Sequence, residues 1–181
     1  MYKRQAGLFY FPHYGNYPVY DAKQNTRTVA DLQLVAWMLS QFSTIEEIKA
    51  AMQDIRVVPV DTTGASSTVH WRIGDANGRQ VVLEFVDGVP CFYENEISVL
   101  TNSPGFPWQM TNLNNYVNLY PGGAEAHQLG GVTIFPFGAG SGFQGIPGDV
   151  TPPSRFVRAA FYKATAPQCA TAYDLSLIHI S

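Results

Sequence analysis

Two antiparallel strands joined by a tight turn are predicted by the segment Val69-His70-Trp71-Arg72-Ile73-Gly74-Asp75-Ala76-Asn77-Gly78-Arg79-Gln80-Val81-Val82-Leu83-Glu84-Phe85-Val86. Apolar and polar residues alternate from Val69 to Ile73, which is the period of a strand. Asn77-Gly78 favours a hairpin turn because both residues tolerate a positive φ. A second turn at Asp87-Gly88 leads into Cys91-Phe92-Tyr93. We therefore expect a three-stranded antiparallel meander.

Helical patterns precede the meander. Thr28-Val29-Ala30-Asp31 is typical of a capping box and predicts a helix through Phe42, with Leu32 on its apolar stripe. Ser43-Thr44-Ile45-Glu46 predicts a second capping box, followed by apolar residues at helical spacing.

Helical patterns also follow the meander. A short strand, Ser98-Val99-Leu100-Thr101, is expected first, and then a helix from Phe106 to Val117. Asn118 to Val150 holds nine of the sixteen glycines and predicts loop and extended backbone. Thr151 then caps a helix that begins at Pro152. Helices before and after an antiparallel meander in the sequence indicate an α+β domain. No segment of the sequence indicates a linker between two domains.

The composition excludes several classes of protein. Of the 181 residues, 46% are hydrophobic and 14% are charged, so one globular domain with a sizeable core is expected. The net charge is −3 and there is no Lys/Arg run, so neither nucleic acid nor an anionic membrane is an expected partner. No apolar stretch approaches the ~20 residues of a membrane helix.

The two cysteines do not predict a disulfide framework or a metal site. Cys91 lies in a predicted strand, where a buried, inert thiol is expected, and Cys169 receives no role. Neither has Cys or His neighbours at metal-ligand spacing.

Asn102 and Arg155 stand beside backbone that proline and glycine restrict. Asn102 lies in Leu100-Thr101-Asn102-Ser103-Pro104, where an asparagine before a proline turn is usually a turn former. An amide on a rigid element can also donate to a developing oxyanion. Arg155 opens a helix after Pro152-Pro153-Ser154; it could bridge to a carboxylate such as Asp149, or could lower a thiol pKa.

These segments, with Asn112-Leu113-Asn114-Asn115-Tyr116 between them, resemble the choloylglycine hydrolase family. The family contains the bile salt hydrolases and penicillin V acylases, which are N-terminal-nucleophile (Ntn) cysteine amidases. The resemblance runs from about Gly7 to Tyr162 and covers about the middle half of a full family member. The segment from Gly140 through Pro147-Gly148-Asp149 to Arg158 is the more specific of the two motifs.

The resemblance implies a fold and a mechanism. The fold is a four-layer αββα sandwich, incomplete here because the N-terminal nucleophile strand and the C-terminal strands are missing. The mechanism needs no cofactor: a terminal cysteine attacks a linear amide, Asn102 and the backbone N–H of Tyr10 stabilise the oxyanion, and Arg155 tunes the thiol. A main-chain donor at Tyr10 tolerates any side chain, though tyrosine leans toward penicillin V-like substrates. Phe11, His13 and Tyr14 are expected to line the acyl pocket.

The nucleophile is absent from the 181 residues, so the chain is expected to be an inactive fragment. Residues 1–5 and 175–181 look non-native, which leaves 6–174 as the central part of one domain. The compartment is therefore undefined. A complete protein is expected to act on a small N-acyl amide, a conjugated bile salt or penicillin V, and to form a homo-oligomer, a tetramer, through an arm at 118–138. Two alternatives stay open: a non-catalytic scaffold or pseudoenzyme, and an amidase for N-acyl amino acids, acyl-homoserine lactones or acylethanolamides.

Overall fold

A four-stranded antiparallel sheet lies at the centre of the computed structural model, which describes residues 4–60 and 68–167. The strand order is β1-β4-β5-β6, with bounds β1 Gln5–Tyr10, β4 Val69–Gly74, β5 Gln80–Val86 and β6 Val89–Glu94. The predicted meander is confirmed, and Gly78 at its first turn has a φ of +86°. The predicted strand Ser98–Thr101 is wrong: the segment has no regular secondary structure and pairs with no described strand, and Ser98 has a φ of +56°.

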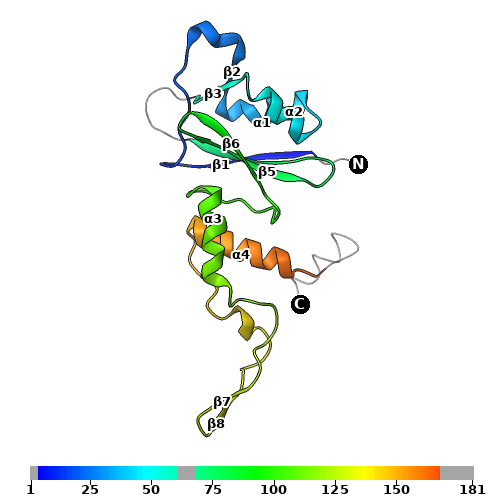
Figure 1. Cartoon of the computed structure of the whole chain (residues 1–181), viewed down its shortest axis with the longest axis vertical. Coiled ribbons are helices and arrows are strands. Elements are labelled where there is room, and N and C mark those ends of the chain that lie inside the picture. The colour runs from blue at the N-terminus through cyan, green and yellow to red at the C-terminus, as the bar shows by residue number, and fades with distance from the viewer. Residues whose placement is uncertain (1–3, 61–67, 168–181) are drawn as a thin grey trace.

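One face of the sheet is covered by α1 (Leu34–Gln41) and α2 (Ile45–Ala51), as Figure 1 shows. Alternate residues of β4 and β5, among them Trp71 and Leu83, point toward these helices and are fully buried. The predicted second capping box is present one residue later than expected. Thr44 and Glu47 exchange side-chain to backbone hydrogen bonds and begin α2.

The first helix begins later than the sequence predicts. Thr28–Ala30 forms β2, which pairs in parallel with β3 (Arg56–Val58), and only a 3₁₀ turn at Asp31–Gln33 precedes α1. The Asp31 carboxylate accepts hydrogen bonds from the N–H groups of Leu32 and Val60, which lies just beyond β3. The pairing of β2 with β3 therefore outweighs the local preference of Thr28–Asp31 for starting a helix. Leu32 is exposed and does not belong to the apolar stripe that the sequence predicts.

The other face of the sheet carries α3 (Phe106–Asn112), the 3₁₀ turn Leu113–Tyr116 and α4 (Pro152–Thr165). Phe106 and Phe156, from the two helices, meet edge to face with ring centroids 6.2 Å apart. They pack on Val82, whose neighbours along β5 point to the opposite face. The predicted helices at Phe106 and Pro152 are confirmed, and helices lie on both faces of the sheet.

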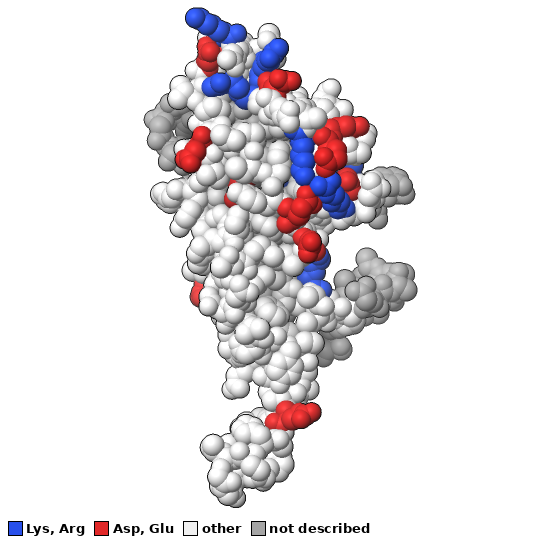
Figure 2. Space-filling view, viewed as in Figure 1, with Lys and Arg blue, Asp and Glu red and all other residues white. Residues whose placement is uncertain are grey.

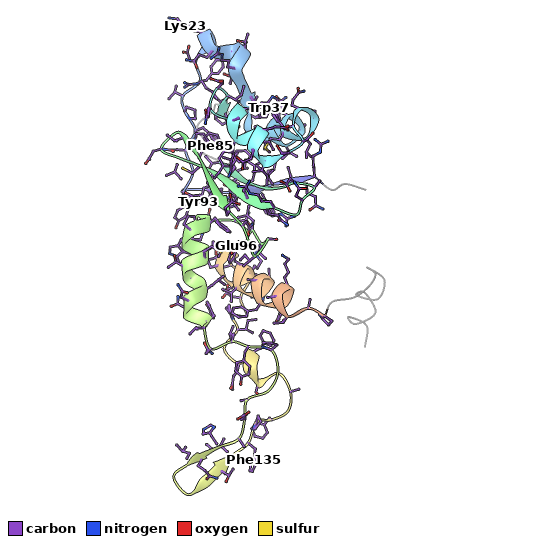
Figure 3. All side chains as sticks on the ribbon, turned by 45° about the vertical axis from the view of Figure 1, so that its right-hand side comes forward. Lys23, Trp37, Phe85, Tyr93, Glu96 and Phe135 are labelled. Atoms are coloured by element: carbon purple, nitrogen blue, oxygen red, sulfur yellow. The ribbon has the colours of Figure 1, made fainter. Side chains whose placement is uncertain are left out.

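A long arm leaves the sheet region between α3 and α4 and ends in the hairpin of β7 (His127–Leu129) and β8 (Val132–Ile134). Figures 1 and 3 place this hairpin, with Phe135 beside it, far from the sheet. Its apolar side chains are exposed: Leu129, Val132, Ile134, Phe135 and Phe137. The glycine-rich stretch is thus an extended arm, as predicted.

Charged side chains gather over the half of the molecule that contains α1 and α2, while the face over the arm is largely uncharged in Figure 2. Within residues 4–60 and 68–167, no helix has both the length and the apolarity needed to cross a membrane. The same residues contain no group of three or more metal-ligating side chains. Cys91 lies in β6 as predicted but is only partly buried, because β6 is an edge strand; Cys169 lies outside the described residues.

Candidate active site

Tyr10 is the last residue of β1, which is one of the two edge strands of the described sheet. The Phe11 N–H donates to Thr68 O at 2.8 Å, so the neighbouring Tyr10–Val69 pair is of the non-hydrogen-bonded kind. The N–H and C=O of Tyr10 therefore both point away from β4, toward the open edge. Its side chain is 52% exposed.

Asn102 lies beside that edge in the turn that follows Thr101. Its Nδ2 donates to Tyr10 O at 2.8 Å, and the adjacent Ser103 hydroxyl donates to Pro12 O at 2.9 Å. The Asn102 amide is thus fixed beside the Tyr10 backbone, although 92 residues separate the two in the chain.

Arg155, in the first turn of α4, fixes the other end of the Asn102 amide. Its guanidinium donates from Nη2 to Asn102 Oδ1 at 2.7 Å and from Nε to Val150 O at 3.0 Å. Because a guanidinium only donates, it must face Oδ1, which leaves Nδ2 directed at Tyr10. None of the ion pairs in the described part of the chain joins Arg155 to Asp149, so the surface-bridge alternative is not what the structure shows.

Asp149 instead anchors the start of α4. Hydrogen bonds from the Ser154 and Thr151 hydroxyls lower the pKa of Asp149 to about 2. Thr151 is the N-cap residue as predicted, but its hydroxyl bonds to Asp149 rather than to the helix backbone. Arg158 donates hydrogen bonds to the carbonyls of Pro147 and Asp149, each at 2.6 Å, and so has a structural role. These contacts hold the helix end that presents Arg155.

The three residues expected in the acyl pocket differ in exposure. Tyr14 is 57% exposed, and its ring stacks on Phe11 with centroids 6.1 Å apart. His13 is exposed and has a φ of +72°, in the left-handed region that favours glycine. Phe11, in contrast, is 1% exposed and lies on the His70 ring, so it supports this surface from beneath.

Three buried polar residues next to the site were not singled out from the sequence: His70, Glu84 and Gln109. Gln109 of α3 directs its Nε2 at three oxygens of the Asn102 turn, the closest being Asn102 O at 3.3 Å. A lone carboxylate in the apolar strand Val81–Val86 is a signal that could have found Glu84, because a buried charge needs a partner.

The arrangement places two N–H donors side by side. The Tyr10 N–H and the second Nδ2 hydrogen of Asn102 have fixed positions at one sheet edge, and Arg155 brings a positive charge within hydrogen-bond distance of the asparagine. Preorganised donors of this kind stabilise negative charge that develops on an oxygen.

The family model of the linear amide C–N hydrolases, choloylglycine hydrolase family, matches residues 5–177. This chain belongs to the choloylglycine hydrolase family. A bile salt hydrolase/transferase of Clostridium perfringens is 38% identical over 160 residues, covering 87% of this chain and 48% of that protein. The chain spans about half the length of the curated relatives it matches.

Solved structures of the family share the fold. A conjugated bile acid hydrolase from Clostridium perfringens superposes with a TM-score of 0.79 at 34% identity, covering 89% of this chain and 49% of that one. A penicillin V acylase from Agrobacterium tumefaciens gives 0.71 at 22% identity, covering 98% and 48%, which supports the fold alone.

Proposed function

We propose that the complete protein hydrolyses linear amides of the N-acyl type, with Asn102, Arg155 and the Tyr10 N–H at its catalytic site. The observation that carries the proposal is the hydrogen-bonded series from Tyr10 through Asn102 to Arg155, found in a member of an amide hydrolase family. In this proposal the nucleophile is an N-terminal cysteine of the complete protein, and neither Cys91 nor Cys169 has that role. The 181-residue chain alone is then inactive.

The proposed reaction has two steps. The terminal cysteine thiolate adds to the amide carbon, and the oxygen that becomes negative accepts hydrogen bonds from the Tyr10 N–H and Asn102 Nδ2. The tetrahedral intermediate expels the amine, which takes its proton from the enzyme's α-amino group, and an acyl-enzyme remains. Water then attacks the thioester and releases the acid. Arg155 keeps Asn102 in the donating orientation and favours the thiolate by its charge.

The substrate class follows from the relatives and from the exposed aromatic rings. Relatives named as bile salt hydrolase and conjugated bile acid hydrolase point to conjugated bile salts. The exposed rings of Tyr10 and Tyr14 offer flat apolar area beside the donors, which also suits the aryl-acyl group of penicillin V. His13 lies between them in the loop, and Phe11 backs the surface.

The complete fold and assembly are proposals too. We expect a second sheet, from sequence outside the described residues, to complete a four-layer αββα sandwich. The arm has exposed apolar residues and a hollow of about 610 Å³ lined in part by Ile134, Phe135 and Phe137. A patch of this kind is typical of a protein interface, and we expect the arm to join copies into a tetramer. A monomer in light scattering of the complete protein would refute this.

The deciding experiment begins with the DNA upstream of the Ala6 codon. We expect an open frame that reaches an N-terminal cysteine; the complete product is then assayed against penicillin V and glycine- and taurine-conjugated bile salts. Hydrolysis that disappears when this cysteine is changed to alanine supports the proposal. If the complete protein folds but is inactive on these substrates, N-acyl amino acids, acyl-homoserine lactones and acylethanolamides are tested next. Inactivity on all of these substrates favours a non-catalytic scaffold.

A further inference from the structure

A buried pair of titratable side chains lies behind the proposed site. His70 of β4 is 0% exposed, Glu84 of β5 is 1% exposed, and His70 Nδ1 lies 2.9 Å from Glu84 Oε1. Burying such groups is costly unless hydrogen bonds and a partner compensate. Their side chains point to the α3/α4 face of the sheet, opposite the apolar core of Trp71 and Leu83.

The hydrogen bonds define where the protons lie. His70 Nε2 is 2.8 Å from Thr101 O, and a carbonyl only accepts, so Nε2 carries a proton. The contact between Nδ1 and Oε1 then requires a second proton between these two atoms. Glu84 Oε1 also accepts from the Phe106 N–H at 2.8 Å. Two donors converging on one oxygen are the arrangement of a carboxylate, so the ring of His70 donates on both sides.

His70 contacts the residues that are adjacent in sequence to the two proposed oxyanion donors. Its Nε2–H holds the carbonyl of Thr101, the residue directly before Asn102. The ring also stacks on Phe11, directly after Tyr10, with centroids 4.3 Å apart and planes 9° from parallel. Glu84 extends the same network to α3 through the Phe106 N–H. One imidazole ring therefore contacts a residue next to each donor: the backbone carbonyl of Thr101 and the side-chain ring of Phe11.

We infer that His70 and Glu84 form a buried positioning pair that sets the distance between the Tyr10 N–H and the Asn102 amide. The inference rests on the amidase function proposed above. Neither side chain is exposed, so the pair acts on the donors indirectly, through the residues that it contacts: Thr101 and Phe11 beside the donors, and Phe106 of α3. Its effect belongs to the transition state, because the donors it aligns bind the oxygen most strongly when that oxygen is charged.

The first test is Glu84→Gln in the complete protein, which keeps the side-chain volume and an acceptor for the Phe106 N–H but removes the carboxylate. We expect kcat to fall ~10- to 100-fold with KM changed by less than about 2-fold, as for a small misplacement of catalytic groups. Asp31→Asn is the matched control: Asp31 is 3% exposed and also accepts two backbone N–H groups, but lies away from the site. Its kcat should stay within about 2-fold.

His70→Gln is the second variant, because its amide nitrogen can still donate to Thr101 O while the stacking on Phe11 is lost. We expect kcat to be lowered here as well. In an Asn102→Ala background, Glu84→Gln should lower kcat much less than it does in the unaltered protein, because one of the two donors that the pair aligns is already absent. Full additivity of the two changes would overturn the inference.

A spectroscopic readout separates this inference from the proposed function. Nitrogen-15 NMR of histidine-labelled protein should show protons on both ring nitrogens of His70, and on one only in Glu84→Gln. A singly protonated ring in the unaltered protein overturns the inference even if both variants fail to fold. A doubly protonated ring in a protein whose Asn102→Ala variant is fully active would leave the pair in place and sink the proposed catalytic site.

Discussion

The two faces of the central sheet differ in chemistry although the same strands make both. Toward α1 and α2, β4 and β5 present only apolar side chains such as Trp71 and Leu83, and their cluster is fully buried. Toward α3 and α4, the alternate positions present His70, Arg72 and Glu84 beside a smaller apolar cluster. The period of two thus separates a face for stability from a face that positions polar groups.

The largest effect expected on the apolar face is the loss of Trp71. Trp71→Ala should lower the free energy of unfolding by ~3–5 kcal/mol, because it leaves a cavity in a fully buried cluster. Urea unfolding of the complete protein measures this. Trp71→Phe should cost clearly less, since the indole N–H has no hydrogen-bond partner among the described residues. Equal losses for the two variants would contradict a packing origin.

On the polar face, Asn102→Ala should separate activity from stability. We expect kcat for amide hydrolysis to fall ~100- to 1000-fold, the usual cost of one oxyanion donor, with a loss of stability of about 1 kcal/mol. Ser103→Ala, which removes only a hydrogen bond to Pro12 O, is the control and should keep most of the activity. A fully active Asn102→Ala would remove the functional distinction between the faces.

A smaller effect is expected at the capping box of α2, on the apolar side. Thr44→Ala should destabilise the protein by about 1 kcal/mol, because the Glu47 N–H loses its side-chain acceptor. Hydrolysis measured at saturating substrate should not change, since α2 touches none of the site residues. Ser43→Ala removes no capping side chain and should be neutral in the same unfolding assay.

The smallest effect is expected for the pH dependence of stability, to which one carboxylate near each face of the sheet contributes. Hydrogen bonds from Arg79 lower the pKa of Glu94 to about 2 on the α2 side, and the Ser154 and Thr151 hydroxyls do the same for Asp149 on the α4 side. A lowered folded-state pKa means that each contribution is complete above the ordinary carboxyl range and is lost as pH falls toward 2. Glu94→Gln and Asp149→Asn should each flatten the dependence of unfolding on pH in this window.

Salt distinguishes the two contacts. The Glu94–Arg79 pair is an exposed ion pair, so added salt should weaken it, whereas the neutral hydroxyl donors to Asp149 should be insensitive to salt. An equal response of both variants to salt would show that Asp149 depends on charge rather than on hydroxyl donors.

Local sequence patterns predicted the elements whose hydrogen bonds are local. The hairpin at Asn77-Gly78 and the capped helix after Thr44 follow from turn and cap chemistry. The predictions at Thr28–Ala30 and Ser98–Thr101 failed because distant contacts decide there: β3 pairs with the first, and His70 binds the carbonyl at the end of the second. A short stretch of sequence carries no information about a hydrogen-bond partner that lies far away in the chain.

The site shows the same limit. Tyr10, Asn102 and Arg155 could be selected only through the resemblance to a family, because each has an ordinary interpretation as a strand, turn or surface residue. The structure brings these three together, while their catalytic roles stay predictions. His70 and Glu84 were not selected because each is an isolated polar residue in a strand of the sequence, and only the pairing of β4 with β5 brings the two side chains together in a buried position.

The hydrogen bonds of the Asn102 amide have a consequence for the order of folding. They join residues 92 and 53 positions apart, whereas the β4–β5 and β5–β6 hairpins close over short turns. Closing long loops costs more chain entropy and is slow, so the hairpins should form well before Asn102 meets Tyr10 and Arg155. A partly folded chain would then have a nearly complete sheet and no assembled donors, and reactivity would report only molecules that have finished folding.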